Sequence, residues 1–188
     1  MERVDAGRRL CLGCGRAHAR GSIDRRRLLG LGLGGAALLA GGLRGAGASA
    51  AGSADALLLH CIDYRLTTET TNYMAERQLA DKYDEVALAG AALGANTATY
   101  PDWAKTFWEH VQVAIDLHDI RRIIVMDHRD CGAYTVIFGV DFARDPVKEY
   151  EVHAWQLRAL RYQIGQKYPK LAVELLLMDL DGKVETVG

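Results

Sequence analysis

The sequence has few cysteines and prolines, and after residue 50 it is short of positive charge. Its 188 residues include four cysteines and three prolines, and the formal net charge is −1 at pH 7. Nine of the 23 basic residues and three of the 24 acidic ones precede position 51, which leaves 14 basic and 21 acidic residues, a net charge near −7, on residues 51–188. This acidity argues against nucleic acid or an anionic membrane as a partner of residues 51–188. That segment is still long enough to bury one core.

Two loops that would indicate phosphate chemistry are missing. A cysteine phosphatase of the C-x5-R type needs an arginine six positions after its cysteine. The residue at that position after Cys61 is Thr67, which is not basic. Ile137 stands at that position after Cys131. The sequence also has no Gly-rich loop of the G-x4-G-K type, so neither phosphate-binding pattern is available.

Residues 1–50 have the three-part layout of a cleavable export signal. An Arg-Arg-Arg-Leu-Leu sequence stands at 25–29, positions 28–43 are uncharged and contain six glycines, and Ala-Ser-Ala follows at 48–50. A membrane anchor is the alternative, but 16 uncharged residues are short for a bilayer core of about 30 Å. We therefore expect a signal at 1–50, a folded domain at 51–188 and a periplasmic or otherwise exported protein.

The paired arginines resemble a twin-arginine signal, with Asp24 where that motif often has Ser or Thr. The general secretory route is the alternative. Proteins that carry twin-arginine signals are exported folded, so a cysteine-based metal site could be filled in the reducing cytoplasm before export. Cys11, Cys14 and His18 have the spacing of metal ligands but no second ligand pair, and we interpret them as incidental residues of the leader.

Apolar runs and helix-spaced patterns alternate along the rest of the chain. We expect strands at 56–61, 85–90, 123–126, 173–178 and 183–187, and helices at 67–79, 101–118, 132–138 and 146–168. Pro101 suits the first turn of one long helix, and Asp145 with Pro146 suits the start of the other. The alternation predicts an α/β fold with a mostly parallel central sheet of four to five strands and flanking helices.

Cys61, His128 and Cys131 form a candidate zinc site. Two thiolates and one imidazole supply three ligands and leave the fourth position to water or substrate, which is typical of catalytic zinc. Cys61 ends one expected strand and His128 lies just past the end of another, and open α/β sheets bind ligands at the carboxyl ends of their strands. The two residues meet if the first and third strands are neighbours. The helix expected after Cys131 should lower the pKa of that thiol.

The motifs C-I-D-Y-R at 61–65 and H-R-D-C-G at 128–132 resemble the C-x-D-x-R and H-x-x-C signatures of β-class carbonic anhydrases. The resemblance implies a β-carbonic-anhydrase-like fold and a hydro-lyase, carbonate dehydratase, with Zn²⁺ as its cofactor. It also implies that Cys61, His128 and Cys131 are the zinc ligands, and that zinc-bound hydroxide attacks carbon dioxide to give bicarbonate. A homodimer or higher homo-oligomer, with the sites near the interface, is expected as well.

By the same resemblance, Asp63 and Arg65 form the acid–base pair beside the metal. Asp63, oriented by Arg65, can accept a hydrogen bond from the bound hydroxide and aim its lone pair at the substrate. Asp63 can also swing in as a fourth ligand and close the site. We therefore expect the activity to fall as the pH drops. His60 and Tyr64 flank this pair and are candidate proton shuttles.

The substrate pocket departs from the family pattern, because residues 66–71 lack the proline-containing segment that often follows the first motif. A hydrolase of carbonyl sulfide or carbon disulfide on the same site is therefore an alternative. A non-catalytic zinc-stabilised module, or a dithiol protein with a Cys61–Cys131 disulfide, is another. The candidate pocket walls are aromatic: Tyr64, Trp103, Tyr134 and Phe138.

Overall fold

The computed structural model describes residues 52–188. Its elements, in chain order, are β1 (Ala56–His60), η1 (Tyr64–Leu66), α1 (Thr67–Glu76), β2 (Tyr83–Ala87), α2 (Ala92–Asn96), α3 (Pro101–His118), β3 (Arg122–His128), α4 (Gly132–Phe138), η2 (Phe142–Arg144), α5 (Pro146–Lys167), β4 (Ala172–Met178) and β5 (Val184–Thr186). The expected export signal, with Cys11, Cys14 and His18, lies outside the described residues.

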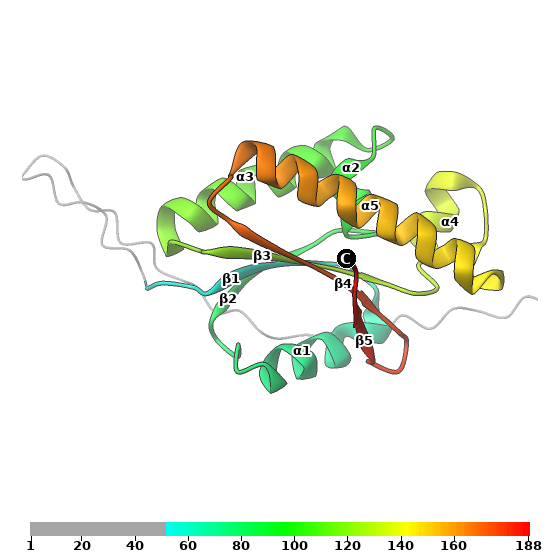
Figure 1. Cartoon of the computed structure of the whole chain (residues 1–188), viewed down its shortest axis with the longest axis horizontal. Coiled ribbons are helices and arrows are strands. Elements are labelled where there is room, and N and C mark those ends of the chain that lie inside the picture. The colour runs from blue at the N-terminus through cyan, green and yellow to red at the C-terminus, as the bar shows by residue number, and fades with distance from the viewer. Residues whose placement is uncertain (1–51) are drawn as a thin grey trace, which may run out of the picture. The chain divides into compact units, whose positions relative to one another are not determined.

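The five strands form one sheet in the order β2-β1-β3-β4-β5. All neighbouring strands are parallel except β5, which runs antiparallel to β4. Helices α2, α3, α4 and α5 cover one face of the sheet, and α1 covers the other (Figure 1). The predicted α/β fold is thus confirmed. No helix within residues 52–188 is both long and apolar enough to cross a membrane.

Alternate side chains of the central strands enter two cores, as the two-residue period of a strand requires. Leu57 and Leu59 of β1 belong to the larger core, where Phe107 of α3 is also fully buried. Leu58 points to the opposite face and packs in a second core with Met74 of α1. Burial on both faces explains why the central strands β1 and β3 contain continuous apolar runs.

Strands β1 and β3 are neighbours, as the predicted meeting of the two motifs requires. Leu57 is paired with Ile123, and the parallel register continues to His60 and Met126. The carboxyl ends of both strands therefore lie at the same edge of the sheet. Cys61 follows β1 directly, while His128 is the last residue of β3.

The segment after β2 differs from expectation. The predicted strand at 85–90 ends earlier, at Ala87, and residues 92–96 form the short helix α2 instead of a loop. Gly90 and Ala91 have φ of 75° and 40°, a conformation that turns the chain sharply. The Ala92 N–H then donates to Asp127 Oδ1 at 2.9 Å. This stabilising acceptor comes from another strand, so local sequence patterns do not reveal it.

The start of α5 gives a direct test of the predicted Asp145-Pro146 signal. Asp145 Oδ1 accepts the Lys148 N–H at 3.1 Å and satisfies one of the free amides of the first turn. We expect Asp145→Ala to lower the free energy of unfolding by about 1 kcal/mol in urea denaturation. Glu151→Ala, at an exposed site on the same helix, is the matched control and should change it by less than about 0.5 kcal/mol. Equal effects of the two variants would show that the cap contributes nothing.

Candidate metal centre

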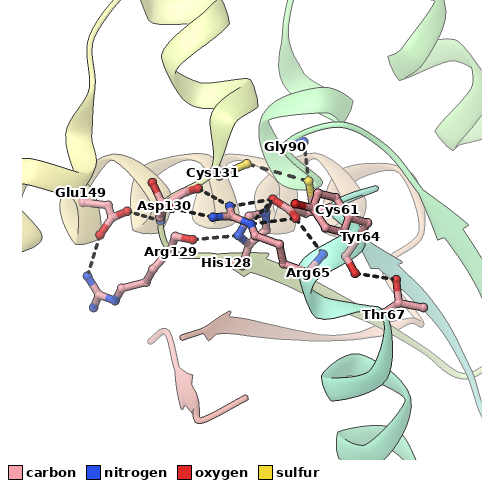
Figure 2. Close-up of polar contacts among 11 residues, drawn as sticks. Cys61, Tyr64, Arg65, Thr67, Gly90, His128, Arg129, Asp130, Cys131 and Glu149 are labelled. Atoms are coloured by element: carbon pink, nitrogen blue, oxygen red, sulfur yellow. Dashed lines mark hydrogen bonds and ion pairs between the residues drawn. The ribbon is translucent and has the colours of Figure 1, made fainter. Parts of the chain in front are cut away.

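The three predicted ligands are brought together at one edge of the sheet. One ligand atom from each of Cys61, His128 and Cys131 lies within 4.8 Å of the other two. The two sulfur atoms are 3.9 Å apart, and the three side chains approach from the ends of β1 and β3 and from the residue before α4 (Figure 2). All three residues are at least nine-tenths buried. The described residues therefore contain a group that could hold a metal ion.

The hydrogen bonding of His128 fits a metal ligand. Nδ1 lies 2.8 Å from the carbonyl oxygen of Arg129, and because a carbonyl only accepts, Nδ1 carries the proton. Nε2 is consequently left with a free lone pair in the neutral ring. That atom is buried and has no hydrogen-bond partner, which is costly for a polar atom. A cation held between Nε2 and the two sulfur atoms would remove this cost, and the donor set of two sulfurs and one nitrogen suits zinc.

The two cysteines have opposite acidities. A hydrogen bond from the Cys131 thiol is the main reason that the pKa of Cys61 lies well below its usual value, and the Gly90 N–H adds to it, at 3.3 Å from Sγ. The same hydrogen bond to Cys61, with burial, raises the pKa of Cys131. The expectation that the following helix would lower the pKa of Cys131 is therefore wrong for the metal-free group. The Ala133 amide does act in that direction, but the neighbouring Cys61 thiolate outweighs it.

Asp63 and Arg65 form a tightly held pair beside this group. The Arg65 guanidinium donates to both carboxylate oxygens of Asp63, from Nε at 3.0 and 3.2 Å and from Nη2 at 2.8 Å. These hydrogen bonds keep the pKa of Asp63 below its usual value. Asp63 Oδ2 lies 3.8 Å from Nε2 of His128. The carboxylate thus faces the ligand atoms, and it would have to leave Arg65 to become a ligand itself.

Asp130 joins the two motifs and was not predicted. Arg65 Nη1 donates to its carboxylate at 2.7 Å, and Arg65 Nη2 donates to its carbonyl oxygen at 2.8 Å. The Asp130 N–H is in turn held by Glu149 Oε1 at 2.6 Å (Figure 2). Arg65 therefore bridges Asp63 of the first motif and Asp130 of the second. The sequence shows only that Asp130 is an acidic residue next to the candidate ligand Cys131. The fold shows that its side chain faces Arg65.

An apolar pocket of about 220 Å³ opens beside the two cysteines and Asp63. The other side chains that line it come from several segments: Ile62, Ala89, Tyr100, Trp103, Ala133, Val136 and Ile137, with Gly132 between them. Of the four aromatic residues predicted as pocket walls, Trp103 is confirmed.

The other three predicted wall residues do not line this pocket. Tyr64 is 85% exposed, because η1 turns its side chain outward, and Phe138 at the end of α4 is 42% exposed. Tyr134 is buried in the core, where its hydroxyl donates to Asp127. Helical spacing in the sequence places Val136 and Ile137 on α4. It does not show which face of that helix lies against the metal centre.

The histidines outside the motifs make other contacts. His60 Nε2 is 2.7 Å from Glu85 Oε1, and His60 lines a cavity next to Cys61. Its role as a proton shuttle, like that of Tyr64, stays a prediction. His118 pairs with Asp84 at 2.8 Å, and both side chains are partly exposed.

Comparisons with known proteins identify a family model and several similar proteins. The profile of a family described as "Putative carbonic anhydrase" matches residues 52–188. An uncharacterized protein of Rickettsia conorii is 39% identical over 134 residues, which cover 71% of this chain and 72% of that protein. An uncharacterized protein of Rickettsia bellii is also 39% identical over 134 residues, covering 71% and 82%. A solved carbonic anhydrase from Glaciozyma antarctica is 13% identical, with a TM-score of 0.49, and the match covers 76% of this chain and 87% of that one.

Single removal of a ligand should abolish metal binding. In Cys61→Ala, His128→Ala and Cys131→Ala, we expect less than a tenth of the zinc content of the parent protein, because two ligands hold zinc poorly. The melting temperature should also fall, since metal binding adds to folding free energy. Inductively coupled plasma analysis measures the first effect and calorimetry the second. His118→Ala is the control, and retention of stoichiometric zinc by the ligand variants would refute the assignment.

Proposed function

The chain belongs to the putative carbonic anhydrase family, and on that basis we propose that it is a zinc-dependent lyase that hydrates carbon dioxide to bicarbonate. One observation carries the proposal: the ligand atoms of Cys61, His128 and Cys131 converge beside an apolar pocket, with the ionised Asp63 facing them. In the proposal, these three residues hold Zn²⁺. Bound zinc would supply the Lewis acidity that makes water a nucleophile near neutral pH.

Asp63 acts on the attacking water molecule. Its carboxylate is fixed by Arg65 but retains lone pairs, because each oxygen can accept more than one hydrogen bond. One of these lone pairs accepts a hydrogen bond from the attacking water or hydroxide, whose own lone pair is then directed into the pocket. Arg65 acts only through Asp63. It keeps Asp63 ionised and stops it from rotating, and Asp130 holds Arg65 from the other side.

The pocket suits a small neutral electrophile. Apart from the two cysteines and Asp63, its lining side chains are aliphatic or aromatic, among them Trp103 and Val136. Carbon dioxide is linear and uncharged, so it can enter such a pocket without losing strong hydration. Bicarbonate is charged and is better solvated by water, so the same apolar wall favours its departure.

A hydrolase of carbonyl sulfide or carbon disulfide is a second candidate on the same site. The apolar lining favours it, since both molecules are also linear and uncharged. Sulfide release without bicarbonate formation from carbon dioxide would identify this activity. A non-catalytic dithiol protein is a third candidate, because the two sulfur atoms are 3.9 Å apart. Purified protein without zinc and without free thiols would support that candidate and refute both enzymes.

We also propose that the enzyme is an exported homodimer or higher homo-oligomer. Several apolar side chains near the pocket are exposed, including Ile62 at 64% and Val136 at 72%, and a second copy of the chain would cover them. The expected signal at 1–50 supports export. A monomer in sedimentation at micromolar concentration would contradict the first proposal, and retention of the protein in the cytoplasm the second.

Substitution of Asp63 separates metal binding from catalysis. We expect Asp63→Asn to bind zinc at the parent stoichiometry and to lose about 100-fold of the hydration rate, because a neutral amide has one acceptor oxygen instead of two and orients the nucleophile poorly. Zinc analysis and a stopped-flow assay of carbon dioxide hydration measure both effects on one sample. Asp84→Asn, a paired carboxylate away from the site, is the matched control. A parent-like rate in Asp63→Asn would refute the role of Asp63.

The hydration rate should fall as the pH drops from about 9 to about 6, because protons compete for the attacking water, which zinc brings to a pKa of about 7. Asp63 cannot cause this loss by becoming protonated. Its folded-state pKa is lowered below the usual value of an aspartate by the hydrogen bonds from Arg65, so it stays ionised throughout this range. A flat pH–rate profile would contradict the proposal.

A further inference from the structure

Asp127 is a buried carboxylate that no step of the reaction uses. It is the residue before His128 in β3 and is 1% exposed. Three donors from three different elements meet on it: the Ala92 N–H of α2 at 2.9 Å, the Tyr134 hydroxyl of α4, and Nδ1 of His153 of α5 at 2.8 Å. A buried carboxylate is tolerated only when its oxygens are well satisfied, and here they are.

The first donor leads to Cys61. Ala92 is two residues after Gly90, whose N–H points at Cys61 Sγ from 3.3 Å. Ala91, between them, has φ 40° and ψ −100°, a conformation that is costly for a residue with a side chain. The turn is thus held from both ends, by Asp127 at Ala92 and by the thiolate at Gly90. Release of the Asp127 end would let the Gly90 amide move away from the sulfur.

The second donor leads to Cys131. Tyr134 lies in the first turn of α4, and its N–H bonds to the carbonyl oxygen of Cys131 at 3.1 Å. Its ring packs in one cluster with both cysteines. The Tyr134 hydroxyl is fixed by Asp127, so the helix that follows Cys131 cannot rotate without breaking that bond.

The third donor closes the cluster from the opposite side. His153 is 1% exposed on α5, and its ring lies against the ring of Tyr134, with centroids 3.8 Å apart. It therefore fixes both the carboxylate of Asp127 and the aromatic face of Tyr134. The buried His153–Asp127 pair is weak evidence for stability, because apolar side chains of the same size often stabilise a fold equally well. We therefore expect the pair to act mainly on the positions of the groups around it.

We propose that Asp127, Tyr134 and His153 form a positioning cluster that sets the metal centre. The cluster fixes the turn that aims Gly90 at Cys61 and the helix that carries Cys131, and Asp127 itself is joined to His128. None of its three side chains is a ligand or meets the substrate. The inference rests on the proposed function only in requiring that the three ligands bind a metal.

The test uses variants that remove one donor at a time from the full protein. Tyr134→Phe deletes only the hydroxyl. His153→Leu deletes the donor at Nδ1, while His153→Asn restores it, because the Asn side-chain amide reaches the position of Nδ1. Leu160→Ala is the control. Leu160 is fully buried on α5 in the larger core, so its replacement should destabilise the same helix without removing a hydrogen bond of the cluster.

Three quantities are measured for each variant: zinc affinity by competition with a chelator, the visible spectrum after substitution with Co²⁺, and the melting temperature. We expect Tyr134→Phe and His153→Leu to weaken zinc binding by about 10- to 100-fold and to shift the sulfur-to-cobalt charge-transfer bands. His153→Asn should recover most of both properties. Leu160→Ala should lower the melting temperature and leave affinity and spectrum unchanged.

The opposite result would overturn the inference. If Tyr134→Phe and His153→Leu are destabilised but keep the parent affinity and cobalt spectrum, as Leu160→Ala should, the cluster is only structural. If His153→Leu does not fold, the isosteric Tyr134→Phe decides the question alone. A parent protein that binds zinc but does not hydrate carbon dioxide would refute the proposed function and leave this test intact. A parent that binds neither zinc nor Co²⁺ would refute both.

Discussion

The parallel pairing of β1 with β3 is the constraint on which the candidate site depends. Cys61 and His128 are far apart in the sequence, and they meet only because their strands are neighbours that end at one edge of the sheet. Burial of both sheet faces fixes the register, since a slip by one residue would turn Leu57 and Leu59 from one core to the other. The distance between Cys61 and His128 therefore depends on hydrophobic packing along the strands that lead to them.

Charge is the second constraint on this edge of the sheet. Asp63 and the two thiols gather there with the guanidinium of Arg65. Without a cation, the thiols divide one proton unequally, so that the pKa of Cys61 is lowered and that of Cys131 is raised. A divalent cation would allow both thiols to ionise and would also satisfy Nε2 of His128. The binding energy of a metal ion at this site would therefore be coupled to the stability of the fold.

The sequence was sufficient to predict the two strands that lead to the candidate site and the three candidate ligands. It did not predict most of the residues that surround the site. Apolar runs identified β1 and β3, and the ligand types in the two motifs identified Cys61, His128 and Cys131, because these signals are local. Asp130 and Asp127 were missed because their partners lie on other elements, and a carboxylate in a loop or strand carries no mark of what it will face. The pocket walls were mostly missed for the same reason: periodicity places Val136 on a helix but does not say which helix face meets the metal centre.

The difference between the predicted ligands and the unpredicted pocket walls has a chemical meaning. Two of the candidate ligands, Cys61 and His128, stand at strand ends, where the sheet fixes them, and Cys131 precedes α4, while the walls of the pocket come mainly from α4 and from the segment around Tyr100 and Trp103. Substitutions on those helices can change the size of the pocket without moving a ligand. Under the proposed function, the sheet would position the groups that generate the nucleophile, and the helices would determine which electrophile reaches it. A pair of motifs near strand ends would then specify the type of reaction while leaving open the choice between carbon dioxide and its sulfur analogues.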